Sequence, residues 1–326
     1  MQTGSAFNVI GSRPGDTLRI AVLSLTTYTL AEASIALVPT LQENPNRLMS
    51  NDGAPALARS VRWRPYLFLL IAPAVVGAAS LVAPRIPAPP AVGDLATFAC
   101  ATLTALSAIT ALSRAPVPTE RRVIILALAA ACLALAGFSH ALSLPTVAAV
   151  AFALVAIGHG VGDFIGSHIE HPGHILPACV VAACIDVTSV LHPSGPSHAV
   201  LASPRALSLL TVSFPVFGAA AVAPVIGIGD LLFIALLLGV ARTHGLRWWK
   251  VAVAAALGVA FAGFLSGMLD RAVPALPLIG AATIGMVHEM RALRRKDRKL
   301  AWAFMAGAVA LCALALVARF WSLPGQ

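Results

Sequence analysis

Long uninterrupted runs of apolar residues are the feature of this sequence that most limits its fold. The runs are about 17 to 24 residues long, the length that a helix needs to cross a hydrocarbon core roughly 30 Å thick. They do not alternate between apolar and polar residues, as the strands of a transmembrane barrel would. With 59% apolar and 11% charged residues, the 326-residue chain lacks the polar surface of a water-soluble domain. We therefore expect an all-α, polytopic membrane helix bundle.

About ten membrane spans are expected, each bounded by proline, glycine or charged residues. They cover residues 18–40, 66–83, 92–113, 122–142, 144–165, 174–192, 222–241, 249–268, 273–290 and 300–320. The apolar run 206–241 is too long for one span and too short for two. Proline and glycine interrupt its first part, so we expect residues 207–222 to form a re-entrant or extended segment followed by one helix.

These spans divide the chain into four parts. A polar N-terminal segment (1–17) precedes an N-terminal bundle of five spans (18–170); spans six to nine occupy residues 171–290, and residues 291–326 hold a basic connection and a further span. No cleaved signal peptide is expected, because no small-residue cleavage site directly follows the first apolar run.

The positive charge of the chain predicts its orientation. The net charge is +9, and with ten spans most of the 22 lysines and arginines fall on one side of the membrane. By the positive-inside rule this side is cytoplasmic and both termini are outside. The basic residues do not alternate with aromatic ones, so no nucleic-acid partner is expected. We expect a multi-pass protein whose surroundings are a lipid bilayer, in the cytoplasmic (inner) membrane of a prokaryote.

Two acidic residues inside apolar runs indicate chemistry, because ionisable groups are expensive in a membrane. Asp186 lies near the exit of its expected span and Asp230 near the entrance of the next, within roughly 9 to 12 Å of the same end. Two carboxylates close together in a low dielectric cannot both ionise easily, so one holds a proton. Aspartyl proteolysis uses this division of charge: one carboxylate takes a proton from water and the other donates to the peptide carbonyl, without metal or other cofactor.

Glycines precede the second aspartate. Gly227 and Gly229 allow a second backbone to approach closely and loosen the start of the helix. A transmembrane aspartate after two glycines is also compatible with a proton relay, an ion site or a packed helix crossing.

Three segments together resemble a family. The run Gly-Ile-Gly-Asp-Leu-Leu-Phe at residues 227–233 resembles the GxGD helix of presenilins and signal peptide peptidases, which are intramembrane aspartyl proteases. Residues 186–196 are similar to the presenilin stretch that begins at the first catalytic aspartate, and residues 273–278 resemble the PAL motif near the ninth span. The resemblance extends over residues 180–285. One departure is Ile185, where the family usually has tyrosine before the first aspartate.

The resemblance implies a presenilin-like arrangement of nine spans, to which this chain adds one C-terminal span. It implies that Asp186 and Asp230 are the catalytic pair. The residues that would line or shape the active site are Gly227, Gly229, Pro274, Ala275 and Leu276. The implied substrate is a transmembrane helix of another membrane protein, locally unwound into a strand. Residues 208–214, rich in β-branched and aromatic side chains, are expected to supply a strand beside it.

Two other functions fit part of the pattern. Ten spans with both ends on one side also suit a proton- or ion-coupled small-molecule transporter, in which the buried acids are ion sites. Type IV prepilin peptidases likewise combine an aspartate near a helix end with a later GxGD. In them a lysine usually lies two residues after the second aspartate, where this chain has Leu232. A transporter has no need of the Pro-Ala-Leu-Pro sequence.

Three further sets of residues are expected to have structural roles. The cluster His159, Asp163, His168, Glu170, His171 and His174 has spacings that a metal site could use, but a polar hairpin at the membrane surface is favoured, and no metal or other cofactor is expected. Glu32, in the middle of the first span, is interpreted as a structural partner of other polar groups. The five cysteines lie in apolar runs without metal spacing and are expected to pack as small apolar residues.

Overall fold

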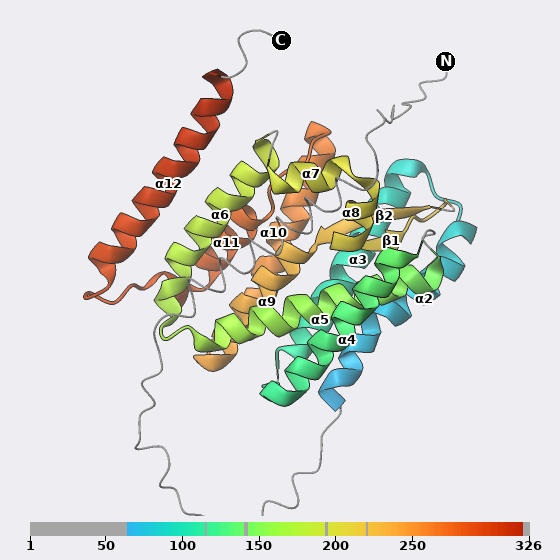
Figure 1. The fold of residues 1–326 in the computed structure, drawn as a ribbon, viewed down its shortest axis with the longest axis horizontal. Coiled ribbons are helices and arrows are strands. Elements are labelled where there is room, and N and C mark those ends of the chain that lie inside the picture. Colours follow the sequence, from blue (N-terminus) through green and yellow to red (C-terminus); the bar gives the residue numbers. More distant parts are fainter. Residues whose placement is uncertain (1–63, 115, 140–142, 193–194, 220, 322–326) are drawn as a thin grey trace, which may run out of the picture.

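The computed structural model describes residues 64–114, 116–139, 143–192, 195–219 and 221–321 (Figure 1). The expected N-terminal segment and first span, with Glu32, lie outside the described residues.

Seven helices of the described chain are long and apolar enough to cross a membrane. They cover Leu67–Arg85, Pro90–Leu112 (α3), Thr119–Phe138 (α4), Leu144–His168 (α5), Pro172–Leu191, Trp248–Leu269 (α10) and Arg298–Ala318. The first combines the 3-10 helices η2 (Arg64–Leu70) and η3 (Ala83–Arg85) with α2 (Ile71–Val82), and the fifth combines η4 (Pro172–His174) with α6 (Ile175–Leu191). The last belongs to α12 (Arg298–Trp321). The protein is thus a multi-pass helical membrane bundle.

Two expected spans are shorter helices. α9 (Ile228–Thr243) has 16 residues and is buried along most of its length, and α11 (Leu276–Met286) has 11 residues. At about 1.5 Å per residue α11 is roughly 16 Å long, too short to cross a hydrocarbon core of about 30 Å. The 3-10 helix η5 (His288–Arg291) follows it. The expectation of a full helical span over 273–290 is therefore not met.

A β-hairpin replaces the start of the expected span 222–241. Strand β1 (Thr211–Pro215) pairs antiparallel with β2 (Val222–Gly227), with an irregular register between Val212 and Ser213. Two short helices, α7 (Pro196–Ala202) and α8 (Pro204–Leu210), precede the hairpin. This hairpin lies within an otherwise helical chain, because proline and β-branched residues favour extended backbone over helix, and β1 overlaps the strand expected at residues 208–214. The expected extended segment is also shorter than 207–222, since residues 207–210 are helical.

Glycines bring α5 and α9 into backbone contact. A Cβ atom at Gly158 would meet Leu231, and Cβ atoms at Gly162 and Gly166 would meet the carbonyl oxygens of Leu232 and Leu236. This four-residue repeat of glycines on one helix face is the small-residue pattern that lets membrane helices pack closely. The repeat fixes α9 along the middle of the bundle.

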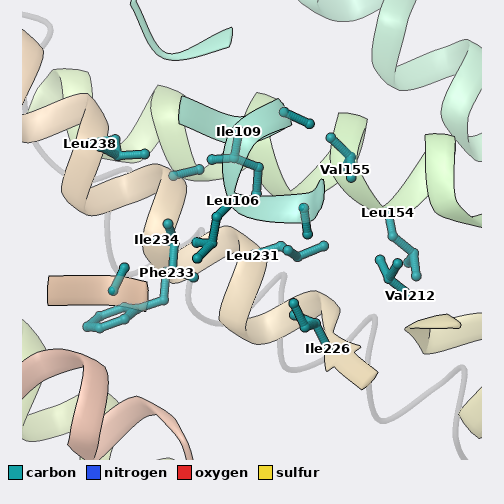
Figure 2. Packing of buried hydrophobic residues seen from close by; sticks show 14 of the residues in the cluster. Leu106, Ile109, Leu154, Val155, Val212, Ile226, Leu231, Phe233, Ile234 and Leu238 are labelled. Carbon is teal, nitrogen blue, oxygen red and sulfur yellow. The ribbon is translucent and has the colours of Figure 1, made fainter. Parts of the chain in front are cut away.

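The buried apolar cluster surrounds this contact. Figure 2 shows side chains of α3, α5 and α9 packed together, with the hairpin residues Val212 and Ile226 at one end of the cluster. Leu154, Leu231, Ile234 and Ile226 are almost completely buried. The hairpin is thus attached to the same core as α9, and β2 leads directly into that helix.

α6 contributes only its first part, with the buried Ile175 and Cys179, to this core and packs on α11 and α12. Figure 1 shows α12 at the edge of the molecule, beside α6. Gly280 of α11 faces Cys179 of α6, and Gly258 of α10 faces the backbone of Ile279. A layer of α10, α11, α6 and α12 therefore packs side by side, and α10 joins it to α3 and α9 of the core.

Candidate active site

The two aspartates come from different parts of the bundle. Asp186 lies in the last third of α6, and Asp230 is the third residue of α9. Both side chains are partly buried, and the two carboxylates are close enough to interact electrostatically. The structure thus brings together the two acids that the sequence singles out.

Asp230 lies in the first turn of α9, just beyond the end of β2. Its Oδ2 accepts a hydrogen bond from the backbone N–H of Gly227 at 3.3 Å. An acid in the first turn of a helix satisfies free N–H groups there and interacts favourably with the positive end of the helix dipole. The bond holds the carboxylate at the junction between strand and helix.

The carboxylate of Asp186, which belongs to α6, lies at the N-terminal end of another helix, α11. Its Oδ2 accepts a hydrogen bond from the backbone N–H of Leu276 at 3.0 Å, and the N–H of Ala275 also donates to this carboxylate. Ala275 and Leu276 are the N-cap and the first residue of α11. The N-terminal ends of α9 and α11 therefore each receive one of the two aspartates, and both helix dipoles favour negative charge in the site.

The positions of Gly227 and Gly229, beside Asp230, have room for a larger side chain. A Cβ atom at Gly227 would lie 3.5 Å from Oδ2 of Asp230, an ordinary contact, and one at Gly229 would meet nothing within 4 Å. Gly229 is exposed at the surface of the described chain. The packing of the described residues does not explain either glycine, and the backbone at Gly229 is open to approach from outside.

The hairpin has one buried and one more open strand. All residues of β1 after Thr211 are buried, whereas Val222 and Pro224 of β2 are exposed. Within the described chain β2 pairs only with β1. Its other edge, which ends three residues before Asp230, has no strand partner among the described residues.

Asp163, which the sequence placed in the histidine cluster, is instead part of a buried ion triad. The carboxylate is fully buried between Nη2 of Arg122 on α4, at 3.1 Å from Oδ2, and Nη2 of Arg242 on α9, at 2.9 Å from Oδ1. His159, one turn earlier, lies 3.4 Å from the hydroxyl of Ser113. Each oxygen of the Asp163 carboxylate thus forms an ion pair with an arginine, although a metal site would need this carboxylate as a ligand.

The other histidines of the cluster have separate partners. His168 Nδ1 bonds the carbonyl of Phe164 at 2.7 Å, His171 accepts from the N–H of Gly173 at 3.0 Å, and His174 contacts Asp297. In the part of the chain that the structure describes, no three His, Cys, Asp or Glu side chains are grouped to hold a metal ion.

The sequence interpretation missed the triad, because Arg122 and Arg242 looked like charges that set the membrane orientation. The only signal was the spacing of Gly158, Gly162 and Gly166 around Asp163, which puts that acid on the face of α5 that meets α9.

Comparison with protein families, with curated proteins and with solved structures gives no match for this chain. The class to which this protein belongs therefore follows from its fold and its candidate site alone. The chain is a multi-pass helical membrane protein with two neighbouring aspartates, each held at the N-terminus of a helix.

Proposed function

We propose that this protein is an intramembrane aspartyl protease that hydrolyses peptide bonds within transmembrane segments of other membrane proteins. The observation that carries the proposal is the hydrogen bond from the backbone of Leu276 to Asp186, together with a position of Asp230 near enough for the two carboxylates to interact electrostatically. These contacts join, at one point, the three segments that resemble presenilin. We place the enzyme in the cytoplasmic membrane of a prokaryotic cell.

The backbone contacts support different roles for the two aspartates. Two N–H groups at the start of α11 stabilise negative charge on Asp186, whereas Asp230 accepts one longer bond from Gly227. Hydrogen bonds to a carboxylate favour its charged form. We therefore assign Asp186 as the general base and Asp230, protonated, as the general acid.

The reaction follows from these roles. Asp186 takes a proton from water while the water oxygen bonds to the peptide carbon, and Asp230 gives its proton to the carbonyl oxygen. The resulting tetrahedral diol then breaks its C–N bond. The amide nitrogen receives the proton held by Asp186, and a diol hydroxyl returns its proton to Asp230 as the carboxylic acid product forms.

The hairpin supports a substrate in extended form. A helical peptide bond is enclosed by its own hydrogen bonds and neighbouring side chains, so it must unwind before water can attack it. The unpaired edge of β2 offers backbone groups to such a segment, as in other cases of strand addition. A strand added there leads toward Gly229 and Asp230, where the described chain leaves the backbone uncovered.

The proposal is tested with the full chain reconstituted in vesicles with a single-span reporter helix tagged at both ends. Asp186→Asn and Asp230→Asn each abolish the appearance of the two tagged fragments, because one carboxylate cannot act as both acid and base. The matched control is Asp94→Asn, at an exposed acid of α3, which leaves cleavage unchanged. Cleavage by the Asp230→Asn variant at the original rate would contradict the proposal.

A further inference from the structure

The connection between η5 and α12 carries a dense cluster of positive charge. Its six basic side chains, all exposed, are Arg291, Arg294, Arg295, Lys296, Arg298 and Lys299. The salt bridges of the described chain include none of the six. We call residues 291–299 the basic connection.

The one acid in the basic connection is already engaged. Oδ2 of Asp297 lies 3.3 Å from Nε2 of His174, at the start of α6. The backbone carbonyl of Ala292 lies against Gly173, so the connection packs on the η4 turn. The η4 turn brings the imidazoles of His171 and His174 beside the connection.

Positive groups crowd around that turn. Partial burial, and then the neighbouring Arg294, His174 and His244, hold the pKa of His171 below its usual value, while Asp297 acts in the opposite direction. Arg298 and Lys299 stand in the first turn of α12, which contains no acid. Because the N-terminal end of a helix is itself positive, cations there are unfavourable unless an anion neutralises them.

Tryptophans locate the membrane interface at this end of the bundle. Trp302, in the first two turns of α12, is 54% exposed, and Trp248 and Trp249 are exposed at the start of α10. α10 begins shortly after His244, which bonds the carbonyl of Ile169 at the end of α5. Exposed tryptophan is typical of the level of lipid headgroups. The basic connection therefore lies where headgroup phosphates are found.

We propose that the basic connection, with the η4 turn, binds the phosphate of an anionic lipid headgroup. A lipid fits better than a soluble anion, because the cations lie at the base of the membrane-spanning α12 and are open to the headgroup layer. The site does not depend on the proposed protease activity.

The test measures lipid binding by the purified full chain in a neutral detergent. Phosphatidylglycerol and phosphatidylcholine are titrated separately, and bound lipid is counted by native mass spectrometry. Phosphatidylglycerol binds more tightly, and Arg294→Gln with Arg295→Gln weakens its binding on the order of tenfold or more, since each juxtamembrane cation contributes to attraction of anionic lipid. The matched control, Arg85→Gln with Arg271→Gln, changes two exposed arginines outside the basic connection and leaves binding unchanged.

Three results would overturn the site. One is equal phosphatidylglycerol affinity in the native chain, the Arg294→Gln/Arg295→Gln variant and the control variant. Another is an equal loss of affinity in that variant and in the control. The third is displacement of the lipid by inorganic phosphate but not by sodium chloride of the same ionic strength, which would make the site one for a soluble anion. Arg294→Lys with Arg295→Lys keeps the charge and retains binding, which separates loss of charge from loss of fold. No substrate is present, so the result is independent of proteolysis.

Discussion

The backbone N–H of Leu276 donates to Oδ2 of Asp186 over 3.0 Å, although the two residues are 90 positions apart in the chain. The bond makes the start of α11 part of the surroundings of the aspartate. It gives the Pro-Ala-Leu sequence a physical role, since the segment presents main-chain donors to a carboxylate. What matters at residue 276 is then the N–H and not the side chain.

Leu276→Pro tests this role of the N–H. Proline lacks the donor and is common at the first position of a helix, where Leu276 stands; because it also disfavours the αR backbone of Ala275, the unfolding temperature of the variant is measured beside its activity. A hydrogen bond to a charged group contributes about 1.5–3 kcal/mol, so cleavage of the reporter helix falls by roughly tenfold or more. Leu276→Ala, which keeps the N–H, loses much less activity. Equal rates for the two variants would show that the bond has no role in catalysis.

Gly162→Ala tests the contact between α5 and α9. The added methyl group would meet the carbonyl of Leu232 and lie 2.8 Å from the Cβ atom of Ala235, and backbone cannot move aside cheaply. Such overpacking costs about 1–3 kcal/mol, so the temperature of unfolding in detergent falls. Cleavage also slows, because α9 carries Asp230.

The control is Gly137→Ala on α4, where a Cβ atom would meet nothing within 4 Å. Alanine there stabilises a helix by about 0.5–1 kcal/mol relative to glycine. If both variants unfold at the same temperature, the close approach of α5 and α9 is not what holds α9 in place.

Much of the bundle was predictable because a long continuous apolar run crosses a membrane as a helix, which satisfies its own backbone hydrogen bonds. The expected spans 92–113, 144–165 and 249–268 agree within a few residues with α3, α5 and α10. The expectation that Leu276 lies beside Asp186 came from treating the segments as one family motif, and Leu276 donates a backbone hydrogen bond to Asp186. These predictions needed only local composition and the order of the segments.

A strand at residues 208–214 was expected, but its pairing with residues 222–227 was not, since a short apolar run looks the same in a strand and in a buried helix and those residues were assigned to a helical span. Val212 and Ile226 are buried against α5 and α9, and this tertiary packing, which no local pattern contains, selects the extended form. The expected span 273–290 was too long at its C-terminal end. His288 and Glu289 interrupt the apolar run, and the chain turns there into η5.

Asp163→Asn tests the buried triad. Removal of the charge leaves Arg122 and Arg242 facing each other with little solvent, since their side chains are 11% and 18% exposed. Breaking one partner of a buried pair costs roughly 3–5 kcal/mol. We expect a clear fall in the temperature of unfolding, compared with little change for the exposed Asp94→Asn.

A compensating variant separates the charge from the packing. Asp163→Leu with Arg122→Met and Arg242→Met removes all three charges, and apolar replacements of buried ion pairs are often neutral or stabilising. Its stability therefore recovers above that of Asp163→Asn. A triple variant no more stable than Asp163→Asn would mean that the triad acts through shape and not through charge balance.

The position of α12 is tested by two native cysteines. The thiols of Cys184 on α6 and Cys312 on α12 are in hydrogen-bonding contact. Residues two apart on a helix point about 200° apart, so Cys184 faces α12 while Asp186 faces α11. Copper phenanthroline, which enters the bilayer, is expected to oxidise this pair to a disulfide, and maleimide labelling then finds two fewer thiols than the five of the untreated chain. Cys312→Ser loses none on oxidation. Equal thiol loss in that variant, or no loss in the native chain, would place α12 elsewhere than against α6.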